Sequence, residues 1–239
     1  MPTYTVKLND RKPVADGTTA FHFEKPTGFM YKPGQFIELT AINPEETDAE
    51  GNTRAFSLAS APSEDFLMVA TRMRDTAFKR YCGKTPVGTP FKIEGPFGDL
   101  TLHRNTARTG VFLAGGIGIT PFRSMVVQAA REKSPHRLCL FYSNRRRSGA
   151  AFLDEMQALE KQNPNYTFVA TMTAKEPFDG WRGETGYIDR EMLSRYLGNL
   201  SGPLYYVAGP PEMVGGLRQM LIAAEVSEDD IRAEEFAGY

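Results

Sequence analysis

The chain is poor in cysteine, in histidine and in net charge. It holds two cysteines among 239 residues, Cys82 and Cys139, and they show no metal-ligand spacing. An iron–sulfur cluster needs about four cysteine ligands, so we expect the chain to carry none. Its three histidines are scattered along the sequence and predict no metal site. The formal net charge of −1 provides no basic field that would favour nucleic acid.

Long apolar segments are absent as well. No run of residues is long and apolar enough to span a bilayer. The N-terminus, residues 1–6, starts directly on a strand-like pattern and lacks the apolar core of a signal peptide. We therefore expect no membrane association and a cytoplasmic location.

The first hundred residues have the pattern of short strands separated by turns. Alternation is clear in residues 36–39, and Lys32-Pro33-Gly34 is a typical turn. This spacing predicts a small antiparallel barrel interrupted by one short helix near residues 76–82. The expected strands are Tyr4–Leu8, Thr18–Glu24, Gln35–Ala41, Thr53–Ala59, Phe66–Arg72 and Pro90–Glu94.

From about Thr109 the pattern changes to strands that alternate with helices, which predicts a parallel α/β sheet. We place the domains at residues 1–105 and 106–239, with the boundary in a polar stretch. The expected strands are Val111–Ala114, Leu138–Ser143, Thr167–Met172, Leu204–Ala208 and Arg232–Phe236. The expected helices are Pro121–Glu132, Ala150–Lys161, Asp189–Leu197 and Pro211–Ala224.

A glycine-rich turn joins the strand at residues 111–114 to the helix that follows. Missing side chains let a pyrophosphate approach backbone N–H groups, and the helix N-terminus offers a positive dipole end. Threonine can cap such a helix and proline suits its first position. A plain strand–helix connection is the alternative, but the strand and capped helix favour a nucleotide. The residues of the turn are Gly115, Gly116, Gly118, Thr120 and Pro121.

Three further motifs are ambiguous when taken singly. Arg54-Ala55-Phe56-Ser57 lies on an expected strand of the barrel. Residues 95–100, Gly-Pro-Phe-Gly-Asp-Leu, close the barrel, and residues 208–213, Ala-Gly-Pro-Pro-Glu-Met, end a strand and start a helix. Each is also explained as an ordinary strand or turn.

The order of these motifs resembles the ferredoxin–NADP reductase family along almost the whole chain. The resemblance implies an N-terminal antiparallel Greek-key β-barrel that holds FAD and a C-terminal Rossmann-like α/β domain that holds a nicotinamide cofactor. It implies that Arg54 pairs with flavin phosphate, that Phe56 packs on the flavin and that the Ser57 hydroxyl reaches its N5 atom. Thr76 resembles part of a second flavin-phosphate element, and Arg72 falls beside it.

The resemblance also assigns the nicotinamide half. The glycine turn matches the family's pyrophosphate site, and Ser143 and Arg145 match its adenosine-ribose site. Serine and arginine there favour the 2′-phosphate of NADP, so we expect NADPH, with NADH as the alternative. Gly209 and Pro210 resemble the nicotinamide-side loop, where Ala208 replaces a cysteine that is common in the family.

The C-terminal residues, 234–239, resemble the family's aromatic and acidic chain end. An aromatic ring there lies against the flavin, and Phe236 and Tyr239 both qualify. Glu235 is a candidate for moving a proton to or from the active site. Ser57 and Glu235 are therefore the expected catalytic residues.

The resulting expectation is an FAD-dependent NAD(P)H reductase. Hydride would pass from NADPH to FAD, and electrons would pass to a separate ferredoxin, flavodoxin or oxygenase component, because the chain has no cluster of its own. Two alternatives remain open. One is a reductase of free flavin or another small molecule, and the other is a non-catalytic flavin-binding subunit, which the loss of the cysteine at Ala208 favours.

Overall fold

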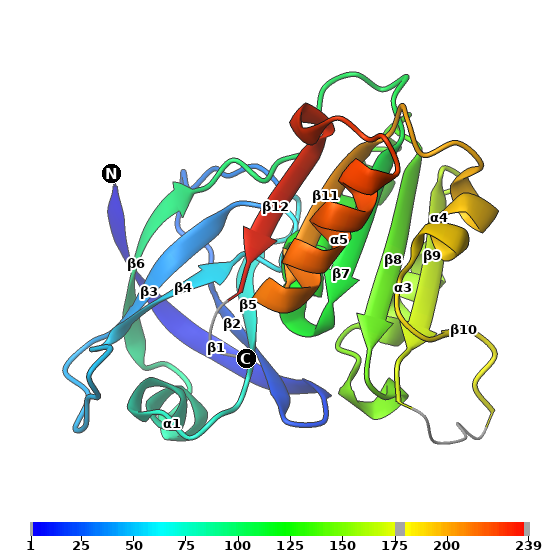
Figure 1. The fold of residues 1–239 in the computed structure, drawn as a ribbon. Coiled ribbons are helices and arrows are strands. Elements are labelled where there is room, and N and C mark those ends of the chain that lie inside the picture. Colours follow the sequence, from blue (N-terminus) through cyan, green and yellow to red (C-terminus); the bar gives the residue numbers. More distant parts are fainter. Residues whose placement is uncertain (1, 175–179, 237–239) are drawn as a thin grey trace.

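The computed structural model describes residues 2–174 and 180–236, which form two domains (Figure 1). The N-terminal domain is a six-stranded antiparallel sheet in the order β4-β3-β6-β1-β2-β5. The Ala59 N–H, just after β4, donates to the Met68 carbonyl of β5 at 2.8 Å, so the outer strands close into a barrel. The strands are β1 (Thr3–Ala15), β2 (Thr18–Glu24), β3 (Phe36–Ala41), β4 (Thr53–Ser57), β5 (Phe66–Arg72) and β6 (Pro90–Phe97).

Helix α1 (Ala77–Lys84) follows β5 and packs against the barrel. It begins where the Thr76 hydroxyl accepts a hydrogen bond from the Lys79 N–H at 3.3 Å. Phe78 and Cys82 lie on its buried side and join the barrel core. The helix N-terminus is thereby fixed beside strands β4 and β5.

The C-terminal domain is a parallel sheet in the order β10-β9-β8-β7-β11-β12. Helices α2 and α3 cover the face toward the barrel, and α4 and α5 cover the other face. The strands are β7 (Gly110–Gly115), β8 (Leu138–Asn144), β9 (Tyr166–Met172), β10 (Glu184–Thr185), β11 (Leu204–Gly209) and β12 (Ile231–Glu235). The helices are α2 (Ile119–Arg131), α3 (Leu153–Leu159), α4 (Arg190–Leu197) and α5 (Pro211–Ala223).

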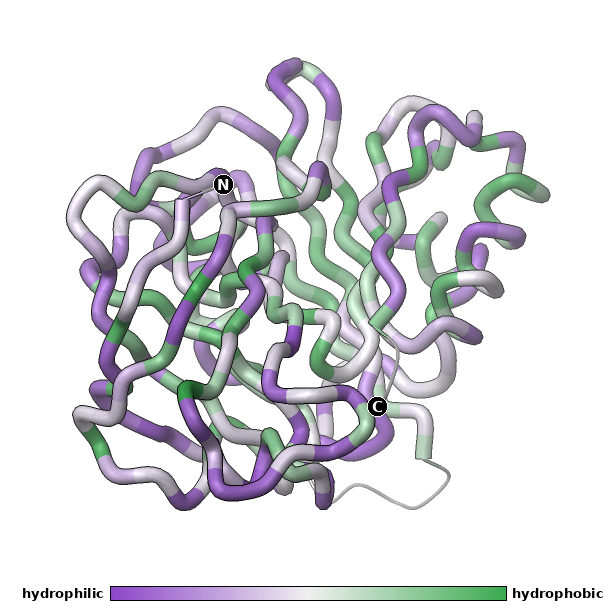
Figure 2. Tube along the Cα trace, turned by 90° about the vertical axis from the view of Figure 1, so that its left-hand side faces the viewer, coloured by the Kyte–Doolittle hydropathy of each residue, from purple (hydrophilic) through white to green (hydrophobic). Residues whose placement is uncertain are grey.

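The central strands of this sheet are buried on both faces. Every residue of β7 and β11 is buried, as expected for a parallel sheet covered by helices on both sides. Figure 2 shows the hydrophobic residues concentrated along these central strands. The predicted two-domain fold, an antiparallel barrel followed by a parallel α/β domain, is confirmed.

Several local predictions need correction. Strand β1 continues to Ala15 instead of ending at Leu8. A 3₁₀ turn over Gly116–Gly118 precedes α2, so Gly118 is the N-cap and Thr120 lies inside the first turn. The Thr120 hydroxyl instead donates to the Ile117 carbonyl at 3.1 Å. Helix α3 starts at Leu153, because the residue before it has a positive φ of 59°.

Two absences apply to residues 2–174 and 180–236. No helix there is long and apolar enough to cross a bilayer. The same residues contain no group of three or more histidine, cysteine or acidic side chains that would hold a metal ion.

Candidate functional site

The ends of β7 and β11 meet at the point where the strand order of the sheet reverses. Strands β8 and β9 lie on one side of β7, whereas β11 and β12 lie on the other. A Cβ atom on Gly209 would lie 3.1 Å from the Cα atom of Gly115, so only glycines let the two turns approach this closely. The carboxyl edge at such a switch point is where ligands bind in open α/β sheets.

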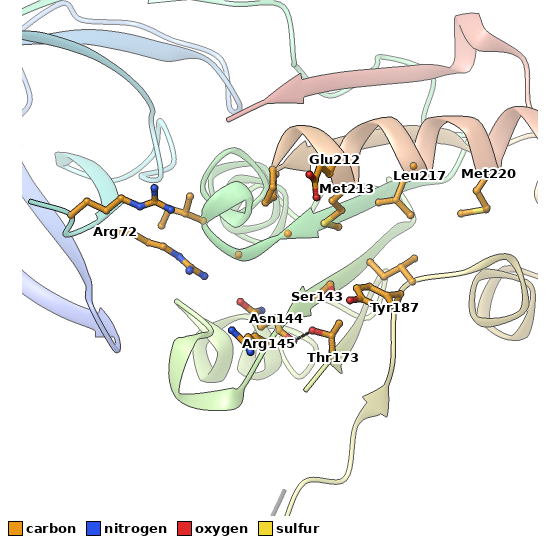
Figure 3. A pocket seen from close by; sticks show the side chains of 18 residues that line it. Arg72, Ser143, Asn144, Arg145, Thr173, Tyr187, Glu212, Met213, Leu217 and Met220 are labelled. Carbon is orange, nitrogen blue, oxygen red and sulfur yellow. Dashed lines mark hydrogen bonds between the residues drawn. The ribbon is translucent and has the colours of Figure 1, made fainter. Parts of the chain in front are cut away.

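A cavity of about 610 Å³ opens over this edge (Figure 3). Helix α5 supplies one wall, from Glu212 to Met220. The ends of β8 and β9 supply the other wall through Ser143, Arg145 and Thr173, together with Tyr187. The cavity has one apolar side and one polar side, which suits a nucleotide with a flat base and charged phosphates.

Three arginines line this cavity: Arg72 and Arg74 from the barrel and Arg145 from the end of β8. None of them has an ion-pair partner within residues 2–174 and 180–236. An Nη atom of Arg72 lies 3.1 Å from where a Cβ on Gly116 would stand, and Gly116 has a φ of +53°. Guanidinium groups beside a glycine turn and a helix N-terminus form a site for phosphate.

The sequence-predicted residues divide into two groups around the cavity. Its wall contains Gly115, Gly116, Ser143, Arg145, Gly209 and Pro210. The remaining residues of the glycine turn, Gly118, Thr120 and Pro121, are buried beneath it. A Cβ on Gly118 would lie 2.2 Å from the Ala208 carbonyl oxygen, so this glycine permits packing against β11. Arg72, expected at the flavin phosphate, instead reaches into this cavity.

The predicted flavin-phosphate donors lie together on the barrel. Arg54 of β4 is beside the N-terminus of α1, and its guanidinium lies over the Phe78 ring at 5.3 Å. One Asp48 carboxylate oxygen is 2.9 Å from an Nη atom of Arg54, and the other accepts a hydrogen bond from the Ala77 N–H at 3.1 Å. This donor set therefore already binds an anion of the chain itself, which shows that its chemistry fits a phosphate.

The rest of the Arg-x-Phe-Ser strand is placed less openly. Ala55 is exposed, whereas Phe56 is 8% exposed and belongs to the barrel core. The Phe56 and Phe78 ring centroids are 5.9 Å apart. Ser57 is buried opposite Phe36 of β3. Contacts of Phe56 and Ser57 with a flavin stay predictions.

The last strand moves the acidic expectation by one residue. Glu234 is paired with Ala208 and shares the sheet face that looks toward the barrel. Burial raises the pKa of Glu234 to about 7. Glu235 is exposed on the opposite face. Phe236 is partly buried against the core shared by both domains, and its N–H donates to the Gly209 carbonyl at 2.9 Å.

Tyr239, the second aromatic candidate for the flavin, lies outside the described residues. Sequence reasoning missed three residues of the site, namely Arg74, Tyr187 and Glu234. The Tyr187 side chain is 79% exposed at the cavity, although large aromatic side chains are usually covered. Its position after the short strand β10 was the available signal, but β10 has only two residues and was not predicted.

The comparisons with known proteins agree with this arrangement. Residues 112–219 match the family described as oxidoreductase NAD-binding domain. The chain is 31% identical over 201 residues to one subunit of the Na(+)-translocating NADH-quinone reductase of Methylococcus capsulatus, which covers 77% of this chain and 49% of that protein. It is 25% identical to the phenol hydroxylase P5 protein of Acinetobacter pittii, which covers 97% of this chain and 64% of the relative. The chain thus spans about half to two thirds of these relatives' lengths.

Solved structures share the whole two-domain fold. The flavohem-like FAD/NAD-binding domain of nitric oxide dioxygenase from Vibrio cholerae has a TM-score of 0.83 at 20% identity, covering 97% of this chain and 98% of that one. A ferredoxin NADP+ reductase from Neisseria gonorrhoeae, with bound FAD and NADP, has a TM-score of 0.81 at 22% identity, covering 98% of both chains. With the fold, the glycine cavity and the Arg54 strand in this order, the chain belongs to the ferredoxin–NADP reductase family.

Proposed function

We propose that this chain is an FAD-dependent NAD(P)H oxidoreductase that passes electrons to a separate acceptor. One observation carries the proposal most directly. Arg72 extends from the barrel to the glycine turn of the α/β domain, so a nucleotide in the cavity would touch both domains. The cavity and the Arg54 site then serve two different nucleotides, one on each domain.

The cavity fits NADPH through its polar residues. The glycine turn and Arg72 would hold the pyrophosphate, and Arg74 adds a second positive charge. Ser143 and Arg145 supply the hydroxyl and guanidinium donors that a 2′-phosphate needs. The exposed Tyr187 ring would stack on the adenine.

The barrel fits FAD through Arg54 and the N-terminus of α1. The Arg54 guanidinium and the Ala77 N–H converge on one point, where a carboxylate now lies. Two phosphate-binding elements suit a dinucleotide better than a mononucleotide. When bound, FAD accepts a hydride from the nicotinamide and releases electrons one at a time.

Glu234 would hold the proton that accompanies this chemistry. Its pKa of about 7 lets the carboxyl group gain or lose a proton near neutral pH. It lies on the barrel-facing side of β12, two residues before the partly buried Phe236. The exposed Glu235 is a poorer candidate for this role, because solvent competes for its proton.

For the acceptor we propose a ferredoxin or an oxygenase component. This rests on relatives alone. The phenol hydroxylase P5 protein matches nearly the whole chain, and a ferredoxin reductase in carbazole 1,9a-dioxygenase shares the fold with a TM-score of 0.81. The two buried cysteines of this chain provide no electron relay of their own.

Reconstitution with FAD tests the proposal. The purified apoprotein should take up one FAD per chain, and anaerobic addition of NADPH should bleach the flavin absorbance. Protein heated to unfold it is the control for free flavin. Failure to bind FAD would contradict the proposed cofactor. Binding without bleaching by either NADPH or NADH would contradict the proposed activity and favour a non-catalytic subunit.

A further inference from the structure

The loop between β3 and β4 is unusually acidic. We call residues 43–52 the acidic loop. It contains four carboxylates and no cationic residue, and all its side chains are exposed or half-buried. The loop crosses the side of the barrel where Arg54 and α1 lie. The four carboxylates are Glu45, Glu46, Asp48 and Glu50.

The acidic loop and the start of β4 supply oxygen partners to all three nitrogen atoms of the Arg54 guanidinium. The Nε atom lies 2.9 Å from a Glu50 carboxylate oxygen, and one Nη atom lies 2.9 Å from Asp48. The other Nη atom donates to the Glu50, Gly51 and Thr53 carbonyls at 2.8–3.0 Å. A phosphate that pairs with Arg54 through two parallel hydrogen bonds must therefore replace carboxylates of the loop.

Asp48 makes the contacts that a phosphate would make at this point. One oxygen faces the Arg54 guanidinium and the other accepts from the Ala77 N–H, the first residue of α1. Lys79 adds a positive group nearby, and burial followed by the charges of Arg74 and Arg54 lowers its pKa. A cluster of cations around a helix N-terminus attracts an anion, and here the chain provides one.

The acidic loop is held by charges more than by packing. Asp48 is 30% exposed and Glu50 is 71% exposed as side chains. A second ion pair joins Glu46 to Arg80 on α1, and both of these side chains are at least one-third exposed. Exposed ion pairs contribute little free energy, so another anion with more charge can displace the loop.

We propose that the acidic loop is an internal competitor for the flavin-phosphate site, with Asp48 standing where a phosphate of FAD binds. FAD must displace the Asp48 carboxylate before Arg54 and the α1 N-terminus are free to accept its phosphate. The loop therefore weakens flavin binding and makes it reversible. This inference rests on the proposed function, which places the flavin phosphate at Arg54.

The test compares FAD binding to the apoprotein of two single-charge variants. Asp48→Asn removes the charge but keeps an oxygen for the Ala77 N–H, so α1 stays capped. Glu45→Gln removes the same charge from the same loop, and Glu45 makes no ion pair within residues 2–174 and 180–236. We expect Asp48→Asn to lower the Kd for FAD on the order of fivefold to tenfold, and Glu45→Gln to change it less than about twofold.

Riboflavin serves as the ligand control, because it lacks phosphate. Flavin fluorescence quenching should show unchanged riboflavin binding in Asp48→Asn, so the gain belongs to the phosphate. Equal FAD affinity in the wild type and both variants would overturn the competition while leaving the proposed function intact. An equal gain for riboflavin would overturn it as well. If no protein in the set binds FAD, the proposed function itself fails.

Discussion

Arg123 of α2 and Glu64 of the barrel form a buried ion pair across the domain interface. An Nη atom and a carboxylate oxygen are 3.0 Å apart, and both side chains are 6% exposed. Arg123 also donates to the Ala59 carbonyl at 2.7 Å and pairs with Glu155 of α3 at 2.6 Å. The pair ties the barrel to the domain that carries the cavity, and so fixes where Arg72 meets the glycine turn.

Removing the Glu64 charge should destabilise the protein. In Glu64→Gln, Arg123 stays buried with only the half-exposed Glu155 as its ion-pair partner, and we expect a loss of about 2–3 kcal/mol in the free energy of unfolding. Glu155→Gln, at a more exposed position, should cost under about 1 kcal/mol. Urea unfolding measures both variants. Equal losses would mean that the Arg123–Glu64 contact does not hold the domains together.

Gly118 should tolerate no side chain. A Cβ there would lie 2.2 Å from the Ala208 carbonyl oxygen, and neither backbone can move without disturbing β7 or β11. We expect Gly118→Ala to lower stability by about 2 kcal/mol. Gly149→Ala is the control, since nothing lies within 4 Å of its added Cβ. Thermal unfolding that shows the same melting temperature for both variants would contradict the packing described for the glycine turn.

Arg145 should decide the preference for NADPH. Arg145→Ala removes a guanidinium donor from the polar wall, so the KM for NADPH should rise about tenfold while that for NADH stays nearly constant. Steady-state reduction of an artificial acceptor gives both values. Arg182→Ala, an exposed arginine outside the cavity, should change neither. Equal losses for NADPH and NADH would refute the assignment of the 2′-phosphate.

Glu234 should make stability fall as the pH rises through about 7. Its pKa in the folded protein is raised by burial, so the protonated form favours folding, and this contribution is lost above the folded pKa. Glu234→Gln stays neutral and should match the wild type near pH 5 but melt at a higher temperature at pH 8.5. Glu235→Gln should follow the wild type throughout. A constant difference between Glu234→Gln and the wild type from pH 5 to 8.5 would contradict the raised pKa.

The sequence predicted elements well where local signals agree. The strand at 18–24 and the strand at 66–72 have the predicted bounds, because alternating or apolar runs there end at clear turn residues. The strand–glycine–helix unit was predicted for the same reason. The start of α2 was misplaced, because local propensity does not reveal the 3₁₀ turn that uses Gly116–Gly118 first.

Site details that depend on pairing or on the path of a loop were not predictable from one sequence. Choosing Glu234 over Glu235 requires the register of β12 against β11, since one residue reverses the face. The contact between Asp48 and Ala77 joins a loop to a helix 29 residues later. Arg72 was assigned to the flavin by resemblance, and only the packing of the two domains shows that it reaches Gly116.

Stopped-flow reduction of the FAD-loaded protein tests the central claim most directly, namely that one domain holds flavin and the other a nicotinamide cofactor that reduces it. Under anaerobic conditions NADPH should bleach the flavin in a single saturable phase, and faster than NADH at equal low concentrations. Arg72→Ala should slow this phase at low NADPH, because Arg72 lies against the glycine turn. A flavin that binds but stays oxidised with both NADPH and NADH would contradict the account.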